Sequence, residues 1–178
     1  MSTPSKSTNQ EKAFRDFADA YLEAGHYPIP IELGTKKPCP YDWQKASGTR
    51  RIWTWKKEFP GAGLGLVMGK PVNDNLHLAA LDIDQDDLVG LVKEVLFPAN
   101  DDVKPQYVAK RGSKGETIFV VFEEQLRGKK FKNAAGSGVE VLADGQQTVI
   151  PPTIHPNGDQ YEWIGECELL DADLTQLP

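Results

Sequence analysis

Apolar residues recur at helical spacing in three parts of the chain. In the first part, Phe14, Phe17 and Tyr21 lie on one face, and Gly25 is a suitable residue to end a helix. We therefore predict a helix over residues 9–24. The same spacing predicts two further helices, over residues 49–58 and 86–96.

Shorter apolar runs, bounded by glycine, proline and polar residues, predict strands. They cover residues 27–33, 64–68, 77–83, 106–109, 117–122, 139–142, 148–150 and 161–164. Pro28 and Pro30 place the first of them at a sheet edge, because proline cannot donate a ladder hydrogen bond. Asp144-Gly145 predicts that the strands on either side of it form a hairpin. The whole pattern predicts an α+β fold with a mixed, mainly antiparallel sheet and flanking helices.

Length and composition limit the organisation of the chain. Its 178 residues are expected to form one domain, which we place at residues 11–168. Residues 1–10 are polar and rich in serine and threonine, so we predict a disordered tail without an export signal there. Residues 169–178 show no further core pattern, and we predict that an acidic linker begins there. No apolar run approaches the roughly 20 residues of a membrane span, so no membrane contact is expected. Cys39 and Cys167 predict reduced thiols in a cytoplasmic protein.

The net charge is −6, from 20 basic and 26 acidic residues. Proteins that coat nucleic acid non-specifically are usually basic, so this charge argues against such a role. It is compatible with a metal-dependent enzyme that acts on phosphates, because the carboxylates of such an enzyme hold cations.

The clearest candidate chemistry lies at the end of the predicted strand 77–83, in the sequence Leu-Asp-Ile-Asp over 81–84. Side chains alternate along a strand, so Asp82 and Asp84 share one face while their apolar neighbours point to the core. Two carboxylates about 6.6 Å apart at Cα can bind one or two divalent cations. The alternative is a strand that ends in an acidic turn, since further aspartates follow.

Glu140 is the candidate third metal ligand. It lies in the predicted strand 139–142 between Val139 and Val141, and a carboxylate in an otherwise apolar strand needs a reason. The alternative is a half-exposed strand on which Glu140 faces water.

Anionic ligands have two candidate contacts. Residues 109–115, Ala-Lys-Arg-Gly-Ser-Lys-Gly, combine small residues with three basic ones, which suits either a phosphate cradle or a plain basic hairpin turn. His155 lies in a proline-rich segment that can present its imidazole, and the Thr153 hydroxyl, to a ligand. The alternative is a histidine on a surface loop.

These motifs stand in an order that resembles the bifunctional primase-polymerase domain of the archaeo-eukaryotic primase superfamily. Residues 81–84 resemble its first catalytic motif, residues 111–115 stand in the place of its second, and Val-Glu-Val over 139–141 resembles its third. Residues 149–156 resemble its closing signature, and the resemblance covers most of the chain. Where the second motif usually carries a histidine, this chain has Thr117.

The resemblance implies template-dependent nucleotidyl transfer, as a DNA primase, a DNA polymerase or both, in phage, prophage or plasmid replication. The implied catalytic residues, Asp82, Asp84 and Glu140, would hold Mg²⁺ or Mn²⁺ ions. The implied nucleotide-binding residues are Lys36, Arg111, Ser113, Lys114, Thr117 and His155. The implied partners are a single-stranded DNA template, nucleoside triphosphates and a helicase region in the same polypeptide.

Three other functions stay open at this point. The same fold can be catalytically silent and bind nucleic acid or nucleotide, which the missing histidine and the acidic net charge favour. The carboxylates can serve a metal-dependent nuclease or phosphodiesterase, a class in which a histidine-rich site is expected. A structural domain without a site would leave the order of the motifs unexplained.

Overall fold

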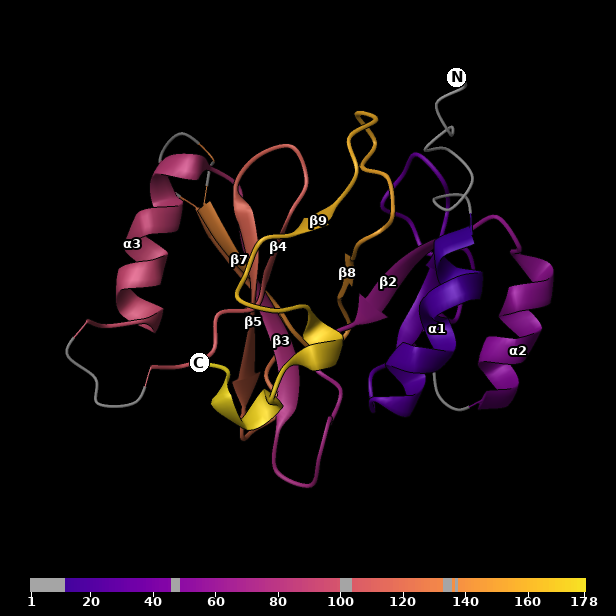
Figure 1. The fold of residues 1–178 in the computed structure, drawn as a ribbon, viewed down its shortest axis with the longest axis horizontal. Helices are drawn as coiled ribbons and strands as arrows, with labels where there is room; N and C mark the ends of the chain where they lie inside the picture. The colour runs from indigo at the N-terminus through magenta and orange to yellow at the C-terminus, as the bar shows by residue number, and fades with distance from the viewer. Residues whose placement is uncertain (1–11, 46–48, 100–103, 133–135, 137) are drawn as a thin grey trace, which may run out of the picture.

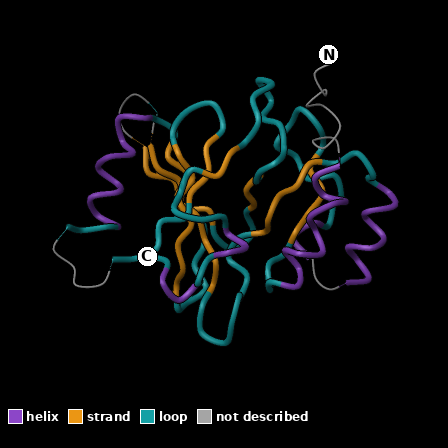
Figure 2. Tube along the Cα trace, in the orientation of Figure 1, coloured by secondary structure: helices purple, strands orange, loops and turns teal. Residues whose placement is uncertain are grey.

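The structure is a computed structural model that describes residues 12–45, 49–99, 104–132, 136 and 138–178. Its α-helices lie at two ends, with the strands and two short 3-10 helices, Leu169–Asp171 and Leu174–Gln176, between them (Figure 1). At one end are α1 (Ala13–Glu23) and α2 (Thr49–Glu58), and at the other is α3 (Asp86–Leu96), as the purple segments of Figure 2 show. The predicted bounds of the second and third helices are confirmed. The predicted start of the first, and the predicted tail over residues 1–10, lie outside the described residues.

The strands form two antiparallel sheets, which confirms the α+β class. The smaller sheet has the order β1-β2-β8, with β1 (Pro28–Ile31), β2 (Gly63–Val67) and β8 (Gln147–Val149). β1 lies at an edge, as its prolines predict. Every residue of β1 and β2 is buried, and these strands share the main hydrophobic core with α1 and α2.

The larger sheet has the order β6-β7-β3-β5-β4-β9. Its strands are β3 (His77–Ile83), β4 (Ala109–Arg111), β5 (Glu116–Phe122), β6 (Lys129–Lys132), β7 (Gly138–Leu142) and β9 (Glu162–Trp163). Leu78 and Ala80 of β3 belong to the main core, whereas Ala79 and Ile83 belong to a second core that α3 covers. Asp82 therefore lies on the face toward the smaller sheet, where the main core ends.

The predicted hairpin around Asp144-Gly145 is wrong, although both strands and the turn exist. The amide of Gln146 donates to the carbonyl of Ala143 at 3.0 Å, which closes the turn. The two strands then part, because β7 pairs with β3 and β6 while β8 pairs with β2. This turn carries the chain from the larger sheet to the smaller one.

Two further expectations need correction. Residues 169–178, expected to begin a linker, contribute Leu169 and Leu177 to the main core, and the amide of Val121 donates to the carbonyl of Pro178. The strand expected at residues 106–109 is observed as β4, shifted toward the charged residues. No helix in the described ranges is long and apolar enough to cross a membrane, and Cys39 and Cys167 are both free thiols.

Candidate active site

The candidate site is a row of polar residues that crosses the larger sheet from strand to strand. Asp82 of β3 lies directly opposite Glu140 of β7 on one side and Thr117 of β5 on the other. The row continues to Lys130 of β6, opposite Glu140, and to Lys110 of β4, opposite Thr117. Directly opposed residues in a sheet project from the same face. The register therefore brings together residues from five strands that the sequence keeps apart.

A pocket of about 160 Å³ lies at this row, between the two sheets. Both sheets contribute to its wall, together with the β4–β5 turn and the segment that carries His155 and Tyr161. Of the predicted site residues, those that line the pocket are Lys36, Asp82, Asp84, Ser113, Lys114, Thr117 and His155. Arg111 and Glu140 are not among the lining residues.

A chain of hydrogen bonds links a buried lysine to the first carboxylate. The Thr117 hydroxyl donates to Asp82 Oδ1 at 2.7 Å and accepts from Lys110 Nζ at 3.0 Å. Lys110 is only 4% exposed, and its Nζ lies 4.7 Å from the centroid of the Tyr161 ring. Burial lowers the pKa of Lys110 to about 8; Asp82 acts in the raising direction and Lys36 in the lowering one. A buried cation without a carboxylate in direct contact is suited to an anionic ligand.

Lys110 is absent from the predicted nucleotide-binding residues, although it is one of the three basic residues of the candidate phosphate cradle over 109–115. The signal was present in the spacing. If residues 112–115 form a four-residue turn, Arg111 pairs with Glu116 and Lys110 with Thr117, and the observed strands pair Lys110 with Thr117. The strand was expected to end at residue 109 because charged residues follow.

Glu140 is held by two neighbours rather than facing water. Lys130 Nζ lies 2.6 Å from Glu140 Oε2, and Gln146 Nε2 donates to Oε1 at 2.7 Å. The Glu140 side chain is 18% exposed. Within the described residues, no group of three or more His, Cys, Asp or Glu side chains is gathered closely enough to hold a metal ion. The three-carboxylate metal site therefore stays a prediction.

The donor set nevertheless fits a hard divalent cation. Directly opposed residues on neighbouring strands have Cβ atoms about 4.5–5.5 Å apart, so Asp82 and Glu140 can reach one ion. Carboxylate oxygens are the ligands that Mg²⁺ and Mn²⁺ prefer. Each carboxylate oxygen has two lone pairs, so Glu140 could join such a site with Lys130 either still at Oε2 or released from it.

Arg111 is engaged away from the pocket. Its guanidinium forms an ion pair with Asp86 in the first turn of α3, and Asp86 also accepts the amide of Gly115 at 3.0 Å. Gly115 has a φ of +60°, and a Cβ there would lie 1.8 Å from the carbonyl oxygen of Ile83. Asp86 and this close approach hold the β4–β5 turn against the end of β3. The turn thereby places Ser113 and Lys114 beside the pocket.

The closing segment positions His155 through a buried hydroxyl. Thr153 is 1% exposed, and its Oγ1 accepts from the Leu64 amide at 2.6 Å and donates to the Leu64 carbonyl at 3.1 Å. Thr153 is therefore an anchor on β2, not the ligand contact that its place in the sequence allowed. His155 Nδ1 lies 2.5 Å from Asn157 Oδ1, and the ring packs edge-on against Tyr161 at 5.3 Å. Nε2 is then the ring nitrogen left for a ligand.

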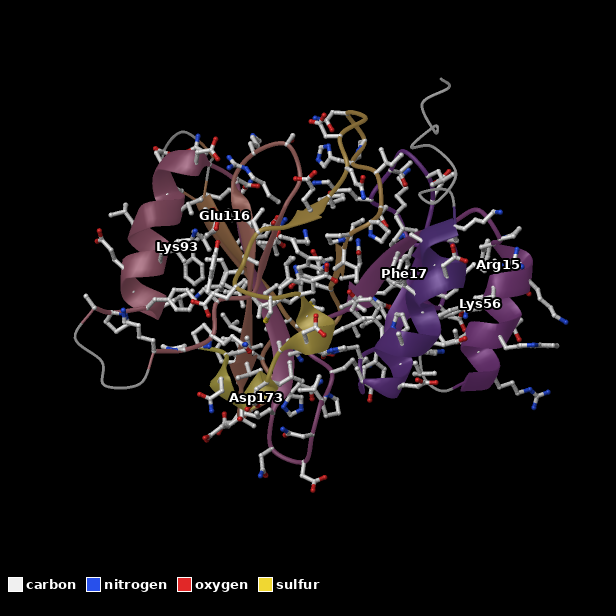
Figure 3. All side chains as sticks on the ribbon, in the orientation of Figure 1. Arg15, Phe17, Lys56, Lys93, Glu116 and Asp173 are labelled. Atoms are coloured by element: carbon white, nitrogen blue, oxygen red, sulfur yellow. The ribbon has the colours of Figure 1, made fainter. Side chains whose placement is uncertain are left out.

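The pocket has a cationic and an acidic part. Lys36, Lys110 and Lys114 line it together with Asp82 and Asp84. Glu116 also lines it, but Lys93 of α3 neutralises that carboxylate across 2.9 Å, and the two side chains lie together in Figure 3. Cations beside carboxylates suit a phosphorylated ligand bound together with a metal ion.

Comparison with known proteins identifies the family of the chain. No curated protein matches the chain. Residues 18–178 match the family model of the bifunctional DNA primase/polymerase N-terminal domain, named Prim-Pol. That match includes every candidate site residue and supports a primase- or polymerase-type function in DNA replication, with DNA and nucleotides as substrates. The chain belongs to the Prim-Pol family of bifunctional DNA primase/polymerase N-terminal domains.

Proposed function

We propose that this domain transfers nucleotides to a growing strand on a single-stranded DNA template, with Mg²⁺ or Mn²⁺ as cofactor. The observation that carries the proposal is the cross-strand row of Lys110, Thr117, Asp82 and Glu140, of which the first three line the pocket. It joins a buried cation for phosphate to carboxylates for a metal ion on one sheet face.

The residues of the row and those around the pocket have separate tasks in the proposed reaction. Asp82, Asp84 and Glu140 would hold divalent cations, which would activate a 3′-hydroxyl and stabilise the charge that builds on the α-phosphate. Lys110, Lys114 and Lys36 hold the triphosphate by charge, and Ser113 donates to it from the turn. His155 lines the pocket, and because the Asn157 amide donates to its Nδ1 at 3.2 Å, its Nε2 can carry the ring proton and donate to the same phosphates. Arg111 acts as a positioning residue, since it ties the turn to Asp86.

Lys110 and Thr117 together would replace the histidine that the second motif usually carries. Thr117 alone brings a hydroxyl without charge, and that hydroxyl is already directed at Asp82. Lys110 Nζ, 3.0 Å from Thr117 Oγ1, brings the positive charge to the same position in the row. The ammonium has three N–H donors and gives one to Thr117, so Lys110 can supply both the hydrogen bond and the charge that a protonated imidazole would supply.

The wider setting is proposed from the resemblance alone. We propose that the domain acts in phage, prophage or plasmid replication in the cytoplasm, together with a helicase region of the same polypeptide. The length of the parent reading frame tests the helicase part directly.

The second candidate is a catalytically silent domain of the same fold that binds nucleotide or nucleic acid. The observation that favours it is the ion pair of Glu140 with Lys130, which occupies the carboxylate that a metal would need. This candidate keeps nucleotide binding through Lys110 but forms no phosphodiester bond.

Nucleotide incorporation on single-stranded DNA, with and without a primer, decides between the two. The reactions contain Mn²⁺ or Mg²⁺ and either wild type, D82A/D84A, or D16A/D74A. The last variant removes the same charge from exposed residues of α1 and the β2–β3 loop. We expect synthesis by wild type and D16A/D74A and none by D82A/D84A. Nucleotide binding without incorporation by wild type would establish the silent domain instead.

A further inference from the structure

The strand β6 concentrates positive charge in an acidic protein. Residues 125–139 contain Arg127, Lys129, Lys130 and Lys132 and no acidic residue, although the chain as a whole carries −6. All four residues of β6 are exposed. β6 is also an edge strand, since among the described residues only β7 pairs with it in the sheet. This patch is therefore open to a polyanion from the side and from both faces.

The patch lies next to the carboxylates of the proposed reaction. Lys130 is opposite Glu140, and Glu140 is opposite Asp82, so two strand spacings separate Lys130 from Asp82. At about 4.8 Å for each spacing, the backbones at these two residues lie about 10 Å apart. A phosphate backbone that follows β6 would pass beside the metal-binding carboxylates, where the strand end or the templating base has to be.

Lys130 serves at present as the counter-ion of Glu140. The Lys130 side chain is 61% exposed and that of Glu140 is 18% exposed, so the lysine reaches inward from solvent to a shielded carboxylate. A divalent cation bound to Glu140 would neutralise its charge and repel the Lys130 ammonium, which would weaken this contact. The released ammonium would stay on the exposed edge beside Lys132.

We propose that β6 docks the phosphate backbone of single-stranded DNA, and that Lys130 would move from Glu140 to a DNA phosphate when Asp82 and Glu140 hold a divalent cation. Metal binding and DNA binding then strengthen each other, because each is favoured by the freed Lys130. This inference rests on the proposed function, since it names the surface that brings DNA to the same site.

The docking surface is tested by fluorescence anisotropy with a labelled single-stranded oligonucleotide over a salt series. K129A/K132A is compared with K12A/R15A, which removes the same charge from two exposed residues, the N-cap and the first turn of α1. Each lost phosphate contact lowers the salt slope by about 0.7 on single strands. We expect K129A/K132A to weaken binding at least about fivefold and to lower the slope by about 1.4. Equal affinity and slope for wild type and K129A/K132A would overturn the docking surface, as would an equal loss in K12A/R15A.

The exchange is tested with K130M, in which Glu140 lacks its counter-ion. Calorimetric titration of K130M with Mn²⁺ alone should give a Kd for Mn²⁺ that is two- to fivefold lower than that of wild type. This range corresponds to the energy of an exposed ion pair. The oligonucleotide Kd is then measured with Mn²⁺ and with EDTA at constant ionic strength. We expect Mn²⁺ to improve DNA affinity more in wild type than in K130M. The same Mn²⁺ Kd in both proteins, or the same improvement in both, would overturn the exchange.

These readouts separate this inference from the proposed function. DNA docking on β6 without incorporation would keep the surface and replace the enzyme by a silent binding domain. Incorporation by K129A/K132A with unchanged DNA affinity would keep the enzyme and overturn the surface. Thermal melting of each variant shows that the compared proteins are folded.

Discussion

The two sheets of this domain differ in what their strands carry. In the smaller sheet, every residue of β1 and β2 is buried, and the side chains are aliphatic or absent. The larger sheet has one face covered by α3, while its other face changes from apolar Ala80 and Phe119 to polar Asp82 and Thr117 within two residues. From the smaller sheet, β8 contributes to the pocket wall, whereas β1 and β2 serve the core and the larger sheet holds the proposed reacting groups. We therefore expect changes in β1 and β2 to affect stability and changes in the cross-strand row to affect chemistry.

Of the changes considered for the two sheets, D82N should reduce nucleotide incorporation the most. Asparagine keeps the shape of the side chain and can still accept from the Thr117 hydroxyl, but it removes the negative charge in the centre of the row. We expect incorporation to fall roughly 10³-fold, in the range seen when a preorganised electrostatic group is lost. The melting temperature should stay within a few degrees of wild type. A folded D82N with wild-type incorporation would show that the row is not the reacting centre.

L66A is the matching change in the smaller sheet. Leu66 of β2 is fully buried in the main core, so truncation leaves a cavity there. The free energy of unfolding should fall by about 2–5 kcal/mol. Below its lowered melting temperature, L66A should keep its incorporation rate. Denaturant unfolding and incorporation on the same sample check both expectations, and a lost rate in a stably folded L66A would break the separation between the sheets.

K110M separates stability from binding within the larger sheet. Methionine fills the volume of Lys110 without a buried charge, so the unfolding free energy should be unchanged or higher. Nucleotide binding should weaken by about 10- to 100-fold, because a charged hydrogen bond is worth about 1.5–3 kcal/mol. Equilibrium titration with a fluorescent nucleotide measures the loss. Unchanged affinity, with K110R also unchanged, would place the triphosphate elsewhere in the pocket.

The pH dependence of nucleotide binding sharpens the role of Lys110 further. Because burial lowers its pKa to about 8, the ammonium is charged below pH 8 and loses its proton above it. We expect a constant Kd between pH 6.5 and 7.5 and a Kd that rises up to about tenfold per pH unit above 8. Burial raises the pKa of Tyr161, so this neighbour stays neutral over that range. K110R, which keeps its charge, should show no such rise; the same rise in K110R would assign it to another group.

Much of the fold follows from local patterns in the sequence. Helical spacing placed α2 and α3, and strand alternation put Asp82 on the face opposite Leu81 and Ile83, which the second core confirms. These features depend on neighbours within a few residues. The division into two sheets depends on pairing between distant segments. The Asp144-Gly145 turn looks the same whether the strands beside it pair or part.

The parts of the site that were missed share a physical reason. Lys110 and β6 lie in segments without apolar alternation, so nothing local marks them as strands. Their places are fixed by the register with Thr117 and Glu140. Leu169 and Leu177 are single leucines in an acidic stretch, and only the three-dimensional core shows what they cover. A row across a sheet joins residues from distant parts of the sequence. Local patterns can therefore indicate single members of the row, but they do not indicate which residues lie side by side in it.

The smallest expected effect belongs to a surface contact of the smaller sheet's helices. Lys56 of α2 and Asp19 of α1 form an ion pair at 2.6 Å, and the Asp19 side chain is 63% exposed (Figure 3 labels Lys56). Because water screens such a pair, K56A should lower the unfolding free energy by less than about 1 kcal/mol, and less still at high salt. Incorporation and nucleotide affinity should match wild type, since this pair lies on the helices and not in the row. Denaturant unfolding at two salt concentrations measures the first expectation. A change in nucleotide affinity would show that a change on the helices alters the pocket. The two sheets would then not act independently.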